Sequence, residues 1–223
     1  MSELPTKPHP GAQPAAVSES LTATVDIAFP EYTAPPPDPI ALLRSWLRDA
    51  HIHGVREPRA LALATADSRR QTSIRTVVVN RLTESGLVFT THRTSLKARE
   101  LRENPWASGL LYWRETSQQI SLSGPVRQLP DADTDALWAE RPVFTHAMTT
   151  ASRQSEPLDD VAALRARAHT LAQAGPQPRP PTYIALELLP HTVEFWANGT
   201  DRLHERLRYD RTPAGWNTTR LQP

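Results

Sequence analysis

The chain has no cysteine among its 223 residues, which excludes disulfides, thiolate metal sites and thiol nucleophiles. No apolar run approaches the ~20 residues needed to span a bilayer, and the polar, proline-rich start lacks the apolar core of a signal peptide. The formal net charge is only +1, so there is no electrostatic basis for binding nucleic acid or an anionic membrane. We therefore expect a cytoplasmic protein whose partners are small molecules.

Several motifs of known chemistry are also missing. The chain has no zinc-ligand spacing, no G-x-S-x-G elbow, no Walker loop and no G-x-G-x-x-G. Its eight histidines show no ligand spacing, so no metal site is expected. There is also no internal repeat. Any site must therefore be assembled from separate parts of the chain.

Proline is abundant, with 22 residues in all. Residues 1–37 combine many prolines with small polar residues and show no sustained periodicity, which predicts a mobile N-terminal arm. Phe29 and Tyr32 would allow its later part to dock on a surface or to cover a site. Residues 38–223 are long enough to bury a substantial core, and we expect them to form a single domain.

Most of this domain has the pattern of short strands separated by polar turns. Asp38 and Pro39 predict the N-cap and first residue of a helix that ends at Gly54. Strands are expected at 60–66, 73–80, 86–91, 107–113, 119–128, 182–188, 192–196, 202–209 and 216–221, helices at 95–103, 131–140 and 158–173, and a polar loop at 142–156. This order predicts a mainly β fold with peripheral helices, built as a closed or split antiparallel barrel.

Three basic residues alternate near the C-terminus: Arg202, His204 and Arg206. In a strand they point to one face, where they repel one another unless an anion or a carboxylate lies against them. A helix would turn His204 away from the two arginines, but the preceding strand formers and the turn at Asn198-Gly199 favour a strand. A solvated basic strand with a surface histidine explains the triplet, taken alone, equally well.

A second cationic group is predicted around Arg75 and Lys97. Arg75 lies inside an apolar strand that we expect to be largely buried, where a guanidinium needs a carboxylate or a phosphate as partner. Thr90 and Thr91 end the next strand. Ser95 and Lys97 then open a helix, whose free N–H groups can cradle a phosphate. Ser95 alone is an ordinary N-cap and Lys97 alone a surface lysine, so only the combination indicates a phosphate site.

Neutral amides suit the edge of a heterocycle, which carries donors and acceptors but no full charge. Gln119 begins a strand, and Gln154 and Ser155 lie in the polar loop. Trp196 is a candidate aromatic wall for a ring system. Surface glutamines and core tryptophans are both common, so each of these signals is weak by itself.

Taken in order, these residues resemble the pyridoxamine 5′-phosphate oxidase family of FMN-binding split barrels. The resemblance covers residues 57–223 and rests on segments such as Arg75-Thr76-Val77-Val78-Val79, Ser95-Leu96-Lys97, Glu194-Phe195-Trp196 and Arg202-Leu203-His204-Glu205-Arg206. It implies a homodimer of split barrels with FMN at the subunit interface. The FMN contacts that it implies are Arg75, Val78, Asn80, Thr90, Thr91, Ser95, Lys97, Gln119, Gln154, Ser155, Trp196 and Arg206, and the substrate contacts are Arg141, Thr145, Arg202 and His204.

Departures from the vitamin B6 oxidases of this family indicate a different substrate. Asn80 stands where they carry a lysine and Leu137 where they carry a tyrosine, both of which contact the substrate phosphate; Thr145 replaces a serine there. Losing the lysine and the phenol removes charge-assisted hydrogen bonds of about 1.5–3 kcal/mol each. The segments 106–109, 112–119 and 203–211 instead resemble the flavin oxidases of phenazine biosynthesis.

This resemblance implies an FMN-dependent oxidase that aromatises a partly reduced tricyclic carboxylic acid, by hydride transfer to FMN and reoxidation by O2. His204 and Arg202 are then the candidate catalytic residues, with His204 as the proton acceptor because imidazole is the usual general base of enzymes. One alternative is a pyridoxine/pyridoxamine 5′-phosphate oxidase. Another, of a different class, is a non-catalytic flavin-binding carrier or sensor.

Overall fold

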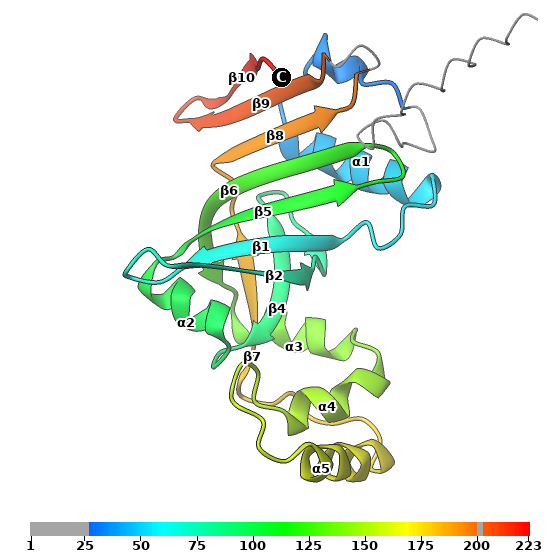
Figure 1. Cartoon of the computed structure of the whole chain (residues 1–223), viewed down its shortest axis with the longest axis vertical. Helices are drawn as coiled ribbons and strands as arrows, with labels where there is room; N and C mark the ends of the chain where they lie inside the picture. Colours follow the sequence, from blue (N-terminus) through cyan, green and yellow to red (C-terminus); the bar gives the residue numbers. More distant parts are fainter. Residues whose placement is uncertain (1–26, 200–202) are drawn as a thin grey trace, which may run out of the picture.

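The computed structural model describes residues 27–199 and 203–223, which form a curled sheet with helices at its periphery (Figure 1). The strands are β1 (Ala60–Ala66), β2 (Thr72–Val78), β3 (Arg81–Leu82), β4 (Leu87–His92), β5 (Trp106–Trp113), β6 (Gln118–Gln128), β7 (Tyr183–Leu188), β8 (Thr192–Ala197), β9 (Glu205–Thr212) and β10 (Gly215–Arg220). The helices are η2 (Pro30–Tyr32), α1 (Pro39–Ile52), α2 (Leu96–Glu103), α3 (Asp131–Ala139), η3 (Val143–Thr145), α4 (His146–Ala151) and α5 (Val161–Gln173).

The sheet is antiparallel and changes direction within β6. Its main path runs β10-β9-β8-β6-β5-β1-β2. β6 pairs with β5 and β8 over most of its length and with β7 through its last three residues. β7 then pairs with β4, and β4 with β3. The predicted class, mainly β with peripheral helices, is therefore confirmed.

Gly124 makes the change of direction in β6 possible. A Cβ atom at this position would lie 2.0 Å from the carbonyl oxygen of Leu189 and 2.8 Å from the backbone nitrogen of His191. The neighbouring backbone occupies that space, so only glycine fits.

The core lies between the inner face of the sheet and α1. This helix begins at the predicted N-cap Asp38, whose Oδ1 accepts a hydrogen bond from the backbone N–H of Ile40 at 2.9 Å. The ring centroid of Trp46 on α1 lies 4.8 Å from that of Phe29 and 5.1 Å from that of Phe195 on β8. Edge-to-face aromatic contacts thus join the segment before α1, the helix itself and the sheet.

Residues 27–37 pack against this core, although the sequence assigns them to a mobile arm. Phe29 is buried, and the hydroxyl of Tyr209 donates to a backbone carbonyl of the segment at 3.0 Å. The guanidinium of Arg220 donates to two further carbonyls of the segment. Aromatic side chains and fixed proline conformations give this segment docking contacts that a polar linker lacks. Residues 1–26 lie outside the described residues.

The structure also corrects the expected burial of β2. The apolar sequence of this strand predicts burial on both faces, but β2 is an edge strand on which exposed and partly buried residues alternate. Ile74 and Val78 are 71% and 60% exposed. Only the alternate positions, including Arg75, face inward. An apolar run cannot distinguish a fully buried strand from an edge strand with an apolar outer face.

Among the places where the elements differ from the sequence expectation, two concern candidate site residues. The predicted polar loop at 142–156 contains η3 and α4, which are too short to produce a recognisable helical period. β9 begins at Glu205, so His204 precedes the strand. Arg202, the third member of the expected basic row, lies outside the described residues.

Candidate cofactor and substrate site

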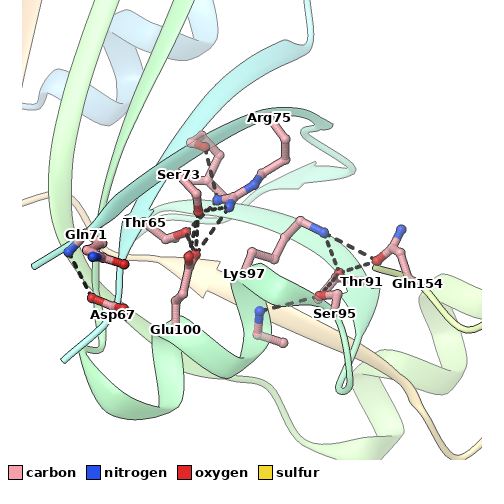
Figure 2. Close-up of polar contacts among 12 residues, drawn as sticks. Thr65, Asp67, Gln71, Ser73, Arg75, Thr91, Ser95, Lys97, Glu100 and Gln154 are labelled. Atoms are coloured by element: carbon pink, nitrogen blue, oxygen red, sulfur yellow. Dashed lines mark hydrogen bonds and ion pairs between the residues drawn. The ribbon is translucent and has the colours of Figure 1, made fainter. Parts of the chain in front are cut away.

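Three of the predicted phosphate-site residues, Thr91, Ser95 and Lys97, come together at the start of α2, and Gln154 joins them. Ser95 is the N-cap, and its Oγ accepts from the backbone N–H of Ala98 at 3.4 Å. Lys97 is only 7% exposed, and its Nζ donates to Thr91 Oγ1 at 3.1 Å and to Gln154 Oε1 at 3.3 Å. Figure 2 shows β4, α2 and the loop after α4 supplying these side chains. The polar surroundings hold a buried ammonium group without a carboxylate in direct contact among the described residues.

Arg75, on β2 beside the same helix, forms an ion pair with Glu100 (Figure 2). Its Nη2 lies 3.2 Å from Glu100 Oε2. Thr65 and Ser73 also donate to this carboxylate, at 2.5 and 2.7 Å. Of the two partners that the sequence left open for Arg75, the structure supplies the carboxylate.

The electrostatics of this region favour an anion. Burial, followed by the positive charge of Arg75, lowers the pKa of Lys97 to about 8, while Glu100 acts in the opposite direction. Burial also lowers the pKa of His92, with smaller effects from Lys97 and Arg141. Four basic side chains therefore share one region, with Glu100 as a counter-charge.

A groove lies between α1 and the end of β2. It has a volume of about 900 Å³ and is lined in part by Val78, Asn80 and Arg59. The hydroxyl of Thr90 donates to Asn80 Oδ1 at 3.2 Å. The predicted contacts Val78, Asn80 and Thr90 thus lie together. Ser155 follows Gln154 in the sequence and is exposed, with a positive φ of 69°.

A second group of predicted residues lies on the outer face of the sheet. Gln119, Trp196 and Arg206 are aligned in register across β6, β8 and β9. Arg206 Nε donates to Glu194 Oε1 at 2.7 Å, a hydrogen bond that raises the pKa of Arg206. The ring of His204 lies 4.9 Å from that of Trp196. Part of the predicted basic row is thus neutralised by a carboxylate, as the strand interpretation requires.

Arg141 lies in the turn between α3 and η3 and has unused hydrogen-bonding capacity. Its Nη2 donates to Thr149 Oγ1 at 3.1 Å, and its guanidinium lies 5.6 Å from the ring centroid of Tyr183. Its Nε is buried and has no hydrogen-bond partner among the described residues. Because an unpaired buried donor is costly, this environment fits an oxygen anion. Thr145 donates to the carbonyl of Pro142 at 2.7 Å, one turn away.

One chain does not bring the two groups to a common point. Arg75 on β2 and Trp196 on β8 are separated by β1, β5 and β6 (Figure 1). They also lie on opposite faces, since Arg75 pairs with the buried Leu63 and Trp196 with the partly exposed Gln119. A ligand that contacts both groups therefore requires a second copy of the chain.

Three further residues belong to these groups but were not predicted as site residues: His92, Glu100 and Glu194. No pattern in the sequence marks them as clearly as it marks the basic residues. His92 could have been noticed as a titratable residue that ends the strand containing Thr90 and Thr91. The two glutamates become partners of arginines only through the folded sheet and helix.

Within residues 27–199 and 203–223, no group of three or more histidine, aspartate or glutamate side chains is arranged to hold a metal ion. None of the helices in these two segments has the length and apolar character required to cross a membrane.

Comparison with known proteins identifies two matching family models. The model described as "Pyridoxamine 5′-phosphate oxidase" matches residues 47–175. The model described as "Pyridoxine 5′-phosphate oxidase C-terminal dimerisation region" matches residues 183–223, which include β7 to β10. Together they span the parts of the chain that carry both groups of site residues.

Individual relatives extend the match to nearly the whole chain. A dihydrophenazinedicarboxylate synthase of Pseudomonas chlororaphis is 56% identical over 208 residues, covering 93% of this chain and 94% of that protein. A pyridoxine/pyridoxamine 5′-phosphate oxidase of Gluconobacter oxydans is 37% identical over 189 residues, covering 83% of this chain and 94% of that protein. The crystal structure of PhzG from Burkholderia lata in complex with tetrahydrophenazine-1-carboxylic acid has a TM-score of 0.88 and 51% identity, covering 90% of this chain and 100% of that chain. The protein therefore belongs to the pyridoxamine 5′-phosphate oxidase family.

Proposed function

We propose that this protein is an FMN-dependent oxidase that oxidises a partly reduced phenazine carboxylic acid toward the aromatic phenazine, with O2 as electron acceptor. The observation that carries the proposal is the level of similarity within the family. The chain is 56% identical to a dihydrophenazinedicarboxylate synthase but 37% identical to the vitamin B6 oxidase of Gluconobacter oxydans. The site residues support the same substrate class.

The group at the start of α2 fits the phosphate of a flavin mononucleotide. Lys97 and Arg75 supply the positive charge, and Thr91 and Ser95 supply hydroxyls beside the N-terminus of an eight-residue helix. A dianionic phosphate would compensate the buried ammonium group, which contacts only neutral oxygens among the described residues. Bound FMN would supply the two-electron redox chemistry, so the protein needs no nucleophile of its own.

A homodimer would unite this group with the outer-face group of the other subunit. The match to a dimerisation region supports self-association. The outer face of the sheet is also apolar, since Ile74, Val78 and Tyr112 are exposed there. If a second copy packs on this face, Gln119 and Trp196 of one chain can bind the ring of a flavin whose phosphate is held by the other. The flavin would then lie at the subunit interface.

The substrate pocket lacks the groups that a second phosphate would need. The side chain of Leu137 has no hydrogen-bond donor and is buried against Val88 and Ala185, and Asn80 carries no charge. The buried Nε of Arg141 instead suits a carboxylate. In this proposal Arg141 and Arg202 orient the substrate carboxylates, with Thr145 close to Arg141.

His204 would accept the proton that leaves the substrate as it is oxidised. Its ring contacts Trp196, the proposed wall of the flavin site, and this contact supports a position of the imidazole near the reacting ring. An imidazole titrates near neutrality and can therefore accept and release a proton in each turnover. Aromatisation of the product supplies much of the driving force.

The function is tested by mixing the yellow purified protein with a partly reduced phenazine carboxylic acid in the absence of oxygen. We expect the flavin absorbance to bleach and to recover when air is admitted. Bleaching by pyridoxine 5′-phosphate but not by the phenazine precursor would assign the protein to vitamin B6 metabolism. A bound flavin that neither compound reduces would indicate a carrier.

A further inference from the structure

A carboxylate lies within the proposed phosphate site. Glu100 follows Lys97 by one turn of α2 and is only 6% exposed. Burial raises the pKa of this carboxyl group, but hydrogen bonds from Thr65, Ser73 and Arg75, and the charge of Arg75, outweigh that effect and lower it. The group is therefore an anion at neutral pH, placed where a second anion is expected to bind.

The same contacts fix the orientation of Arg75. Its Nη1 donates to Thr65 Oγ1 at 2.5 Å and to the carbonyl of Leu63 at 3.3 Å. Its Nη2 donates to Ser73 Oγ and to Glu100. Figure 2 shows these bonds on the side of Arg75 that faces β1 and α2. Three neutral oxygens hold the guanidinium as well, so the distinct contribution of Glu100 is its charge.

That charge acts in two ways. Arg75 lies close enough to Lys97 for its positive charge to lower the pKa of the lysine. Without Glu100, these two residues would be neighbouring cations with little exposure to solvent. Such uncompensated charges destabilise a fold. A carboxylate next to Arg75 also repels a phosphate that approaches the same guanidinium. Both effects reduce the free energy gained when phosphate binds.

We propose that Glu100 sets the affinity of this site for phosphate, by compensating Arg75 and Lys97 before the cofactor binds and by opposing its phosphate afterwards. The inference rests on the proposed function, because it identifies the anion as the FMN phosphate. Glu100 is thus a specificity-determining residue that limits the preference for FMN over riboflavin, the same flavin without phosphate.

The test compares wild-type protein with Glu100→Gln, a variant of equal size that retains hydrogen-bonding capacity but loses the charge. Dissociation constants for FMN and riboflavin are measured by quenching of flavin fluorescence. We expect FMN to bind about tenfold more tightly to the variant than to the wild type, because one nearby charge of the same sign as the phosphate is removed. The dissociation constant for riboflavin should be unchanged. The flavin-free variant should melt at a lower temperature than the wild type, and added FMN should raise its melting temperature by more.

Glu103→Gln is the matched control. Glu103 lies one turn further along α2 and is exposed, and its carboxylate accepts only the backbone N–H of Ser68 among the described residues. The substitution removes the same charge from the same helix without touching Arg75. Both flavins should bind to it as they do to the wild type.

The outcomes separate this inference from the proposed function. If the wild type prefers FMN to riboflavin but Glu100→Gln binds FMN no more tightly, the role assigned to Glu100 is wrong and the phosphate site stands. If the wild type binds both flavins equally, the phosphate site itself is wrong. If Glu100→Gln does not fold, the double variant Arg75→Gln/Glu100→Gln is measured. Recovery of folding would support charge compensation, and failure to recover would show that Glu100 acts through packing, against the proposal.

Discussion

The imidazole of His204 lies 4.9 Å from the indole of Trp196, measured between ring centroids, with the two planes inclined by 43°. Trp196 is on β8, and His204 immediately precedes β9. The contact joins the residue proposed as proton acceptor to the residue proposed as the wall of the flavin site. Chemistry at the flavin and proton transfer can therefore take place at one position.

His204→Gln should lower kcat by about 100-fold or more, because it removes the group that we propose as acceptor of the substrate proton. Bound flavin should be retained, since the phosphate group of residues is untouched. The measurement combines steady-state turnover with the flavin absorbance of the purified variant. His169→Gln, on the exposed face of α5, is the control. Loss of flavin with unchanged turnover per bound flavin would contradict the role of His204.

Arg141→Met should raise KM for the reduced phenazine carboxylic acid by about 10- to 100-fold, the cost of one hydrogen bond to a charged group. Flavin affinity should not change. Arg165→Met, an exposed arginine on α5, controls for loss of positive charge. If Arg141→Met lost flavin while its KM stayed the same, Arg141 would belong to the cofactor site.

Lys97 should make the flavin-free protein less stable at neutral pH. Its pKa is about 8 in the fold, lowered first by burial and then by Arg75, against about 10.4 in an unfolded chain. Between these values the unfolded chain binds more protons, so the free energy of unfolding should increase as pH rises from about 8 to about 10.4.

Lys97→Met should therefore stabilise the flavin-free protein at pH 7 by on the order of 2 kcal/mol, and this advantage should shrink toward pH 10. The same variant should bind FMN more weakly than the wild type does, and its affinity for riboflavin should be unchanged. Urea unfolding at the two pH values and flavin titrations measure both effects. Arg102→Met, exposed on the same helix, is the control. A Lys97→Met protein that is less stable than the wild type at pH 7 would contradict the inference that the buried charge of Lys97 destabilises the flavin-free fold.

Glu187 should stabilise the fold above its pKa. It is 1% exposed and accepts hydrogen bonds from Thr83 Oγ1 at 2.6 Å and Arg127 Nε at 2.8 Å. Burial raises its pKa, but these hydrogen bonds outweigh burial and lower it. A lowered carboxyl pKa adds stability above the unfolded value of about 4.3, and this stability is lost as pH falls through the folded value.

Glu187→Gln should lower the free energy of unfolding by about 2 kcal/mol at pH 7, because it weakens a buried, hydrogen-bonded pair whose arginine is largely exposed. The difference from the wild type should diminish below pH 4. Glu84→Gln, exposed in the turn before β4, is the control. A difference that is the same at pH 7 and pH 3 would mean that packing, not charge, is lost.

The alternating and turn patterns of the sequence predict most of the sheet. β1 spans residues 60–66 as expected, and α1 begins at its predicted N-cap Asp38. The burial of β2 could not be predicted, because Ile74 and Val78 are apolar whether they face a core or an exposed sheet surface. α4 is missed because six residues contain too few turns to show a period.

The candidate site, too, could be predicted only in part from the sequence. Residues that share a local segment, such as Ser95 and Lys97, are predicted together and lie together. The ion pair of Arg75 with Glu100 joins residues that are 25 positions apart, and only the packing of β2 against α2 produces it. Sequence pattern identifies charged residues that need a partner, whereas the fold determines which partner each receives.

The proposed substrate is a carboxylic acid on a fused ring rather than a phosphorylated vitamer. The decisive measurement is kcat/KM of one FMN-loaded preparation for a partly reduced phenazine carboxylic acid and for pyridoxine 5′-phosphate under the same aerobic conditions. We expect the phenazine precursor to be the better substrate by at least about 100-fold, because the proposed pocket lacks two phosphate contacts. Equal or more efficient oxidation of pyridoxine 5′-phosphate would contradict the proposal.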